Sequence, residues 1–256
     1  MRTVLVVIST LFATLALAPV VVVARLMGRP DGENSIYDRC MHAWARSVIR
    51  AAGCRVRIHG DEHLVPGAVY ISNHVSWFDI FALAAELPRY TFIAKREIRR
   101  IPVFGWGAEA AGIVFLDRGN RKQAFAAYET AAVGVREGRN VVVCPEGTRG
   151  YDYHLRPFKK GPFVLAIASQ RPIVPTIVHG TIEIMPKGSF WITPGTIDVR
   201  LLEPVPTAGY DYDHRSELMT VVWNRMADAL RTEYGVGTSE AAVEDETASD
   251  ELQSQP

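Results

Sequence analysis

Cysteine is scarce in this 256-residue sequence, and no group of cysteine, histidine and carboxylate residues has the spacing of metal ligands. Cys40, Cys54 and Cys144 are odd in number and widely separated. They therefore predict reduced thiols in a cytosolic domain rather than a disulfide framework or a metal site. The sequence also lacks a nucleic-acid recognition module and a stripe of aromatic and basic residues, which argues against a nucleic-acid-binding protein.

Charged residues are absent from the segment 3–24, which is rich in valine and leucine. About 22 residues at ~1.5 Å per residue are just long enough to cross the apolar core of a bilayer. The triplet Ala16-Leu-Ala18 resembles a signal-peptide cleavage site, but Pro19 would directly follow the cut and the apolar run continues beyond it. We therefore predict a retained membrane anchor in residues 1–30.

The charges that flank the apolar segment predict its orientation. Arg25 and Arg29 follow the segment, and only Arg2 precedes it. This difference favours a catalytic body on the cytoplasmic side of the inner membrane. The pattern leaves open whether the segment spans the bilayer or forms part of a re-entrant hairpin.

Basic residues are absent from residues 237–256, which are acidic, polar and almost free of large apolar side chains. This composition predicts a disordered tail. The whole chain has 28 basic and 28 acidic residues, so without the six acidic residues of the tail the remainder has 28 against 22, a net charge of +6. A basic body suits an anionic membrane surface or a phosphorylated substrate.

Residues 31–236 are predicted to form one folded domain. Apolar residues at helical spacing between Met41 and Ala52 predict an amphipathic helix that ends at Gly53 and packs on the core or rests on the membrane interface. Strand and helix patterns then alternate, which predicts the α/β class with a central mixed sheet flanked by helices. The expected strands are 68–72, 91–94, 112–116, 140–144, 173–178, 190–193 and 196–202, and the expected helices are 80–85, 121–137, 160–169 and 216–234.

His74 and Asp79 form the main catalytic pattern. His74 lies on the turn after an expected strand, and Asp79 lies in the first turn of the helix that follows. A carboxylate in this position can fix the tautomer of the imidazole and stabilise the imidazolium, which leaves the other nitrogen as a base. The spacing alone is a weak signal, because seven histidines give such a match by chance in about one of three chains of this kind.

Two later loops carry arginines at expected strand ends, where ligands gather in open α/β sheets. Arg118 follows Asp117, and Arg149 lies three residues after Glu146 in the run Cys144-Pro-Glu-Gly-Thr-Arg149. Gly147 lets the backbone approach a ligand closely, and Glu146 is expected to hold the Arg149 guanidinium for bidentate contact with a phosphate. Each arginine has an alternative role as an ordinary surface charge.

Four segments, in this order and at these separations, resemble the motif blocks of the glycerolipid acyltransferases. The likeness is closest to the bacterial 1-acyl-glycerol-3-phosphate acyltransferases and covers roughly residues 37–234. The segments are 73–79, 112–118, 144–149 and 173–176. Cys144 stands where the family often has an aromatic residue, and Gly150 stands where it usually has serine.

The resemblance implies transfer of an acyl group from coenzyme A or acyl carrier protein to the sn-2 hydroxyl of lysophosphatidic acid, at a membrane and without a metal or bound cofactor. It implies that His74 takes the hydroxyl proton while Asp79 orients His74. Ser76 is structural in this family, although it is also a conceivable acyl-enzyme nucleophile. Pro175 is expected near the acyl site, and the residues expected to bind the substrate phosphate are Lys95, Arg118, Glu146, Gly147 and Arg149.

Other functions fit part of the same pattern. The acceptor can be a different lysolipid, such as a lysophospholipid with a larger head group or a lyso-ornithine lipid. The basic residues suit any phosphate, and Arg118 with Arg149 favours an exposed monoester without excluding a diester. A membrane-anchored hydrolase would use the same dyad to activate water on thioesters or lipids. A lipid-binding scaffold without turnover is disfavoured, because both members of the dyad are present.

Overall fold

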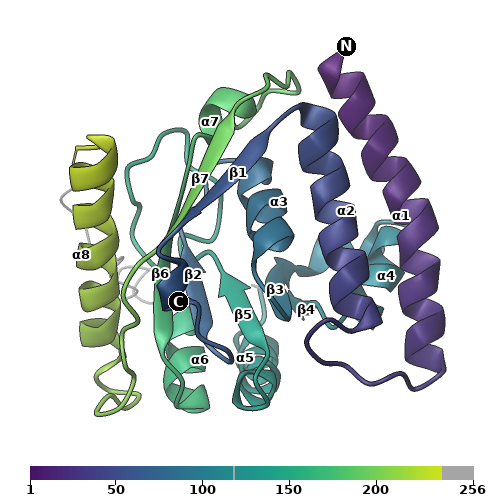
Figure 1. Cartoon of the computed structure of the whole chain (residues 1–256). Coiled ribbons are helices and arrows are strands. Elements are labelled where there is room, and N and C mark those ends of the chain that lie inside the picture. The colour runs from purple at the N-terminus through teal and green to yellow at the C-terminus, as the bar shows by residue number, and fades with distance from the viewer. Residues whose placement is uncertain (118, 238–256) are drawn as a thin grey trace, which may run out of the picture.

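The computed structural model describes residues 1–117 and 119–237, and in these residues seven strands form one mixed sheet (Figure 1). The spatial order is β1-β7-β6-β2-β5-β3-β4. β6 and β7 pair antiparallel and all other neighbours pair parallel, so β1 and β7 run opposite to the other strands. The strands are β1 Arg55–His59, β2 Val69–Ser72, β3 Tyr90–Lys95, β4 Val114–Leu116, β5 Asn140–Val143, β6 Ile173–His179 and β7 Thr196–Leu201.

Alternate residues of the central strands face two apolar cores, because successive side chains of a strand point to opposite faces. Val69 and Ile71 pack with α5, α6 and α8, whereas Tyr70 packs with α2 and α3. The sheet is therefore the middle layer between two layers of helices (Figure 1). The helices are α1 Arg2–Leu26, α2 Ile36–Ala52, α3 Trp77–Glu86, α4 Phe104–Ala110, α5 Arg121–Arg136, α6 Gly161–Ser169, α7 Thr181–Ile184 and α8 Arg215–Tyr234, with 3-10 turns η1 Asp61–His63 and η2 Arg96–Arg100.

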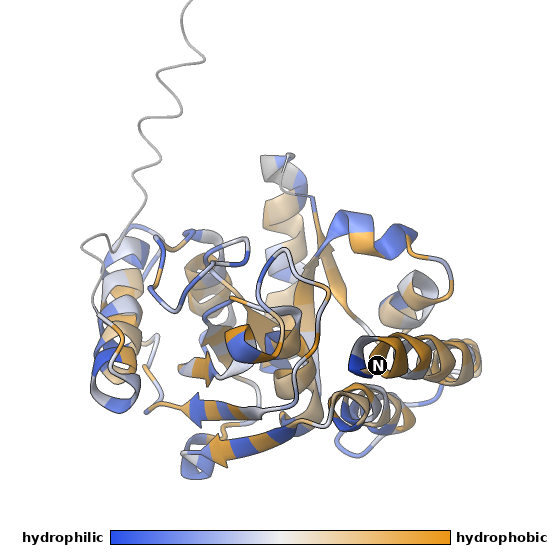
Figure 2. Ribbon diagram, turned by 90° about the horizontal axis from the view of Figure 1, so that it is seen from above, coloured by the Kyte–Doolittle hydropathy of each residue, from blue (hydrophilic) through white to orange (hydrophobic). Residues whose placement is uncertain are grey.

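The N-terminal helix α1 is a long apolar helix at one side of the molecule (Figure 2). It is long and apolar enough to cross a membrane, judged by length and composition. It also packs against the body, since Val6, Ala13, Val21 and Ala24 are buried and the Trp44 indole of α2 donates to the Thr14 hydroxyl at 2.9 Å. The amphipathic helix α2 therefore lies between α1 and the sheet.

The α/β class and the mixed sheet are confirmed, but one expected strand is wrong. Residues 190–193 are irregular and do not pair with a strand. Instead, the Phe190 carbonyl accepts a hydrogen bond from the Thr3 hydroxyl of α1, and the Ile192 N–H donates one to it. The strand β1, the helices α4 and α7 and the two 3-10 turns were not expected. Two glycines lower the helix propensity of α4. The predicted acidic tail lies, apart from Gly237, outside the described residues.

Candidate active site

The site lies at the carboxyl end of the central strand β2, where the chain turns into α3. β2 pairs with β6 on one side and β5 on the other. The turn begins at Asn73, whose buried side-chain amide bonds both the carbonyl and the N–H of Val178 in β6, at 3.0 and 2.8 Å. These two hydrogen bonds to the neighbouring strand fix the backbone from which His74 projects.

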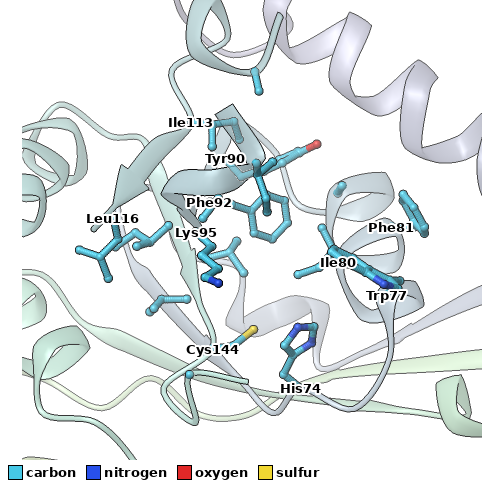
Figure 3. A pocket seen from close by; sticks show the side chains of 18 of the residues that line it. His74, Trp77, Ile80, Phe81, Tyr90, Phe92, Lys95, Ile113, Leu116 and Cys144 are labelled. Atoms are coloured by element: carbon cyan, nitrogen blue, oxygen red, sulfur yellow. The ribbon is translucent and has the colours of Figure 1, made fainter. Parts of the chain in front are cut away.

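His74 and Asp79 meet as the sequence predicted. The His74 Nδ1 atom lies 2.9 Å from Asp79 Oδ2. The same carboxylate oxygen accepts the backbone N–H groups of Val75 at 2.7 Å and Ser76 at 2.8 Å. Asp79 is fully buried and the His74 side chain is 16% exposed, so the imidazole is held at Nδ1 while Nε2 is left for a substrate. Figure 3 shows the His74 ring among the side chains that line the cavity.

The α7 segment closes the site behind Asp79. The Thr181 hydroxyl donates to Asp79 Oδ1 at 2.5 Å, and both residues are fully buried. The Ser76 hydroxyl accepts the Phe78 N–H at the start of α3 and donates to the Met185 carbonyl at 2.7 Å. Ser76 is fully buried, so its hydroxyl caps α3 and ties it to α7.

The Tyr153 hydroxyl holds the backbone on both sides of Thr181. It accepts the N–H groups of Gly180 at 2.7 Å and Ile182 at 3.1 Å, and it donates to Glu183 at 2.8 Å. Tyr153 belongs to the long loop between β5 and α6, which also carries Glu146 and Arg149. The dyad and this loop are therefore joined through α7.

Glu146 has a different partner from the one that the sequence suggested. Its buried carboxylate accepts the His74 backbone N–H at 2.9 Å and the Arg156 Nε–H at 3.0 Å, whereas the Arg149 guanidinium lies over the Trp77 ring at 4.8 Å. The expected Glu146–Arg149 ion pair is wrong, because the turn at Gly147, with φ +76°, directs Glu146 inwards beneath His74. Burial raises the pKa of the Glu146 carboxyl, although Arg156 and the His74 N–H act in the opposite direction.

Three of the other residues predicted to bind the phosphate lie at the cavity. Lys95, Gly147 and Arg149 line the same cavity as His74, and Lys95 points into it (Figure 3). Lys95 is exposed and its Nζ lies 3.4 Å from Glu97. Arg118 lies outside the described residues, so its predicted contact with a phosphate stays a prediction.

The cavity has a volume of about 1690 Å³ and runs from the dyad to α1 and α4. Its walls include apolar and aromatic side chains that the sequence did not identify as site residues, among them Trp77, Ile80, Phe81, Phe92 and Leu116 (Figure 3). Pro175 is buried in β6 and is not among the lining residues. The structure therefore does not bring Pro175 to the cavity, and its predicted role near an acyl chain remains a prediction.

The arrangement suits general base catalysis at the end of an apolar cavity. His74 is oriented by a carboxylate, and Lys95, Arg149, Lys159 and Lys160 make the lining near it basic. The backbone N–H groups of residues 74–76 already donate to Glu146 and Asp79. They therefore do not hold an oxyanion, which leaves that task to groups elsewhere on the lining.

Comparisons with known proteins agree with this geometry. The family model described as acyltransferase matches residues 55–179. The 1-acyl-sn-glycerol-3-phosphate acyltransferase of Saccharomyces cerevisiae is 31% identical over 82% of this chain and 70% of the relative, and the human alpha form is 35% identical over 70% and 65%. The crystal structure of the 1-acyl-sn-glycerophosphate acyltransferase PlsC from Thermotoga maritima has a TM-score of 0.70 and 25% identity over 91% of this chain and 98% of that one. This chain belongs to the acyltransferase family.

Proposed function

We propose that this enzyme transfers an acyl group from a thioester to the sn-2 hydroxyl of lysophosphatidic acid and so forms phosphatidic acid. The proposal rests on one observation: the His74–Asp79 dyad lies at a large, mainly apolar cavity whose lining also carries several cations, Lys95 and Arg149 among them. The names of the relatives, which specify 1-acyl-sn-glycerol-3-phosphate, support the same acceptor. The basic lining near the dyad suits its phosphate.

In the proposed reaction His74 is the general base. Its Nε2 takes the proton of the acceptor hydroxyl while the hydroxyl oxygen attacks the thioester carbonyl carbon, and Asp79 stabilises the imidazolium that forms. The tetrahedral intermediate collapses with loss of the thiolate, whose acid has a pKa of about 8 to 9. The thiolate is then protonated, and the products are an ester and a free thiol.

The cations would place the acceptor. Arg149 and Lys95 would hold the phosphate, with Arg118 as a third ligand and with Glu146 and Gly147 shaping the loop. The Trp77 ring beneath the Arg149 guanidinium limits the positions of that side chain. The apolar lining between the dyad and α1 suits an acyl chain.

We propose that the acyl donor is a thioester of either coenzyme A or acyl carrier protein. Both carriers present the acyl group on a phosphopantetheine thiol. A thioester of either kind makes the same demand on His74, so the dyad does not distinguish them. We further propose that the enzyme works at the inner membrane with its body in the cytoplasm. The apolar helix α1 supports the membrane location, and Arg25 and Arg29 near its end suit the anionic cytoplasmic leaflet.

A panel of acceptors tests the proposed substrate. Lysophosphatidic acid should give a two-chain product with a kcat/KM at least about tenfold above those of lysophosphatidylcholine, a lyso-ornithine lipid and monoacylglycerol, because only it has a phosphate monoester. Arg149→Ala should raise the KM for lysophosphatidic acid by roughly tenfold and change the KM for the donor little. Equal effects on both substrates would contradict the assignment of Arg149, and free fatty acid as the main product would identify a hydrolase instead.

A further inference from the structure

The loop between α7 and β7, residues 186–194, exposes two adjacent aromatic side chains. Phe190 is 84% exposed and Trp191 is 79% exposed. The surfaces of soluble proteins seldom present large aromatic side chains in adjacent pairs without a binding role. We refer to residues 186–194 as the Phe190 loop.

The Phe190 loop is attached to the start of α1. The Thr3 hydroxyl donates to the Phe190 carbonyl at 3.0 Å and accepts the Ile192 N–H at 3.2 Å. Figure 1 shows the connection between α7 and β7 extending toward the N-terminal end of α1. Two segments almost 190 residues apart in the sequence therefore meet at one end of the molecule.

The aromatic pair continues an apolar surface. Six apolar side chains in the first turns of α1 are exposed, with exposures of 45% to 73%; they are Val4, Leu5, Val7, Ile8, Leu11 and Phe12. Val7 and Leu11 also line the cavity. Phe190 and Trp191 stand beside the first of these turns through the bonds to Thr3. The loop and α1 thus form one continuous apolar surface.

The charges near this surface are positive. The Phe190 loop contains no acidic residue, and no acidic residue precedes Asp31 in the chain. The ammonium of Lys187, the loop's one charged residue, is turned towards the Arg149 carbonyl at 2.8 Å and the Tyr151 ring at 4.1 Å. Arg2 and the N-terminal amine lie at the start of α1. Apolar and aromatic side chains next to cations match the chemistry of an anionic lipid surface.

We propose that the Phe190 loop is a second membrane contact, in which Phe190 and Trp191 enter the interfacial region of an anionic bilayer beside the start of α1. Indole and phenyl rings prefer this region, and the loop has no acidic side chain that an anionic surface would repel. A lipid surface fits better than a protein partner, because the loop is continuous with the apolar row of α1. The contact places the first turn of α1 at the same depth as the loop, on the same side of the bilayer as the body.

Quenching of tryptophan fluorescence tests the contact in the full chain. Vesicles of phosphatidylcholine and phosphatidylglycerol with bromine on shallow acyl carbons should quench wild-type protein, and Trp191→Phe should lose a clear part of the quenchable emission. Trp223→Phe is the matched control, because Trp223 is 6% exposed among the core residues of α8. It removes an unquenched tryptophan and should raise the quenchable fraction. An unchanged quenchable fraction in Trp191→Phe would overturn the proposal.

A second pair of variants measures the energetic effect of the loop. Phe190→Ser combined with Trp191→Ser should lower the vesicle partition coefficient roughly tenfold, with an unchanged thermal midpoint in detergent. Val133→Ser, which removes a 45% exposed side chain on α5, should leave the partition coefficient unchanged. A wild-type partition coefficient in the double variant contradicts the proposal. Loss of self-association at that unchanged partition coefficient would assign the loop to a protein interface instead.

Discussion

Asp79 is the residue on which the geometry of the dyad depends. Its carboxylate is fully buried, and a buried carboxylate is unfavourable unless donors surround it. Oδ2 accepts from the His74 ring and from two backbone N–H groups, and Oδ1 accepts from Thr181. With donors on both oxygens the carboxylate cannot rotate without losing a bond, so it holds the His74 ring in one orientation.

Thr181 is therefore expected to act as a positioning residue for the dyad. Thr181→Val keeps the shape of the side chain but removes the donor to Asp79 Oδ1, so it should lower kcat by roughly tenfold. The KM for both substrates should change little, because Thr181 is fully buried and does not line the cavity.

Thr181→Ser is the matched control, since it restores the hydroxyl. It should recover most of the lost kcat and keep the thermal midpoint near that of the wild type, whereas Thr181→Val should lower the midpoint by a few degrees because Asp79 Oδ1 loses its donor. If Thr181→Ser is as slow as Thr181→Val, or if KM rises in place of a fall in kcat, the hydrogen bond to Asp79 does not position the dyad.

The sequence predicted the dyad but not its support. His74 and Asp79 lie on one strand–turn–helix unit, so their local spacing determines their contact. Thr181 is 102 residues away from Asp79 in the chain and reaches it only because β6 lies beside β2. The predicted Glu146–Arg149 ion pair was wrong for a related reason. The direction of the Glu146 side chain depends on the backbone conformation at Gly147, which the spacing of the two residues does not determine.

At the scale of elements, the contact between α1 and α4 forms one wall of the cavity. A Cβ atom placed on Gly107 of α4 would lie 2.5 Å from the Ala18 Cβ of α1. The two helices can approach this closely only because residue 107 has no side chain. Both residues also line the cavity.

Gly107→Ala should separate α1 from α4. Overpacking typically costs about 1–3 kcal/mol, which exceeds the gain of about 1 kcal/mol in helix propensity. The thermal midpoint in detergent should therefore fall by a few degrees. Combining Gly107→Ala with Ala18→Gly removes the clash, so the double variant should be less destabilised than the sum of the single variants. Strict additivity would show that the two residues do not touch in solution.

A second element contact predicts a dependence of stability on pH. The His179 ring at the end of β6 stacks between Tyr153 and Tyr234, with centroid distances of 4.2 and 4.3 Å. Burial lowers the pKa of His179 below its ordinary 6.5, although Glu183 and Asp198 act in the opposite direction. As the pH falls through 6.5 the unfolded chain takes up this proton first, so the folded state loses stability until the lower folded-state pKa is passed.

His179→Phe keeps an aromatic ring in the stack but does not titrate. Its thermal midpoint should therefore fall less than that of the wild type between about pH 7.5 and about pH 5.5. Because the variant and the wild type share all other titrating groups, the difference between their slopes of thermal midpoint against pH reports on His179 alone. Equal slopes would mean that His179 is as easily protonated in the folded protein as in the unfolded chain.

Elements with strong apolar patterns were predicted, and elements that depend on tertiary partners were not. The buried strands β2, β5 and β6 appear in the sequence as short β-branched runs. Residues 190–193 have a similar composition but lack a neighbouring strand, and Thr3 supplies their hydrogen bonds instead. Composition alone does not separate a buried strand from an exposed loop that carries aromatic residues.

At the scale of the whole molecule, the carboxyl end of β2 is connected to α1 by the cavity. The dyad lies at the carboxyl end of β2, the cavity extends from it between β3, α3 and α4, and α1 forms part of the far wall. A substrate with a phosphate at one end and an acyl chain at the other matches a cavity that is basic near the dyad and apolar toward α1. The predicted anchor is therefore also part of the cavity.

Transfer of labelled acyl groups tests the central claim most directly. Purified wild-type protein would receive a labelled acyl thioester, as the coenzyme A or the carrier-protein form, with lysophosphatidic acid in vesicles. The label should appear in phosphatidic acid at the sn-2 position. His74→Ala should lower this rate at least about a hundredfold at an unchanged thermal midpoint, since a general base contributes roughly 10² to 10⁴ in rate. The account would be contradicted if His74→Ala formed phosphatidic acid at the wild-type rate. It would also be contradicted if the wild-type protein released the label as free acid whether or not the acceptor is present.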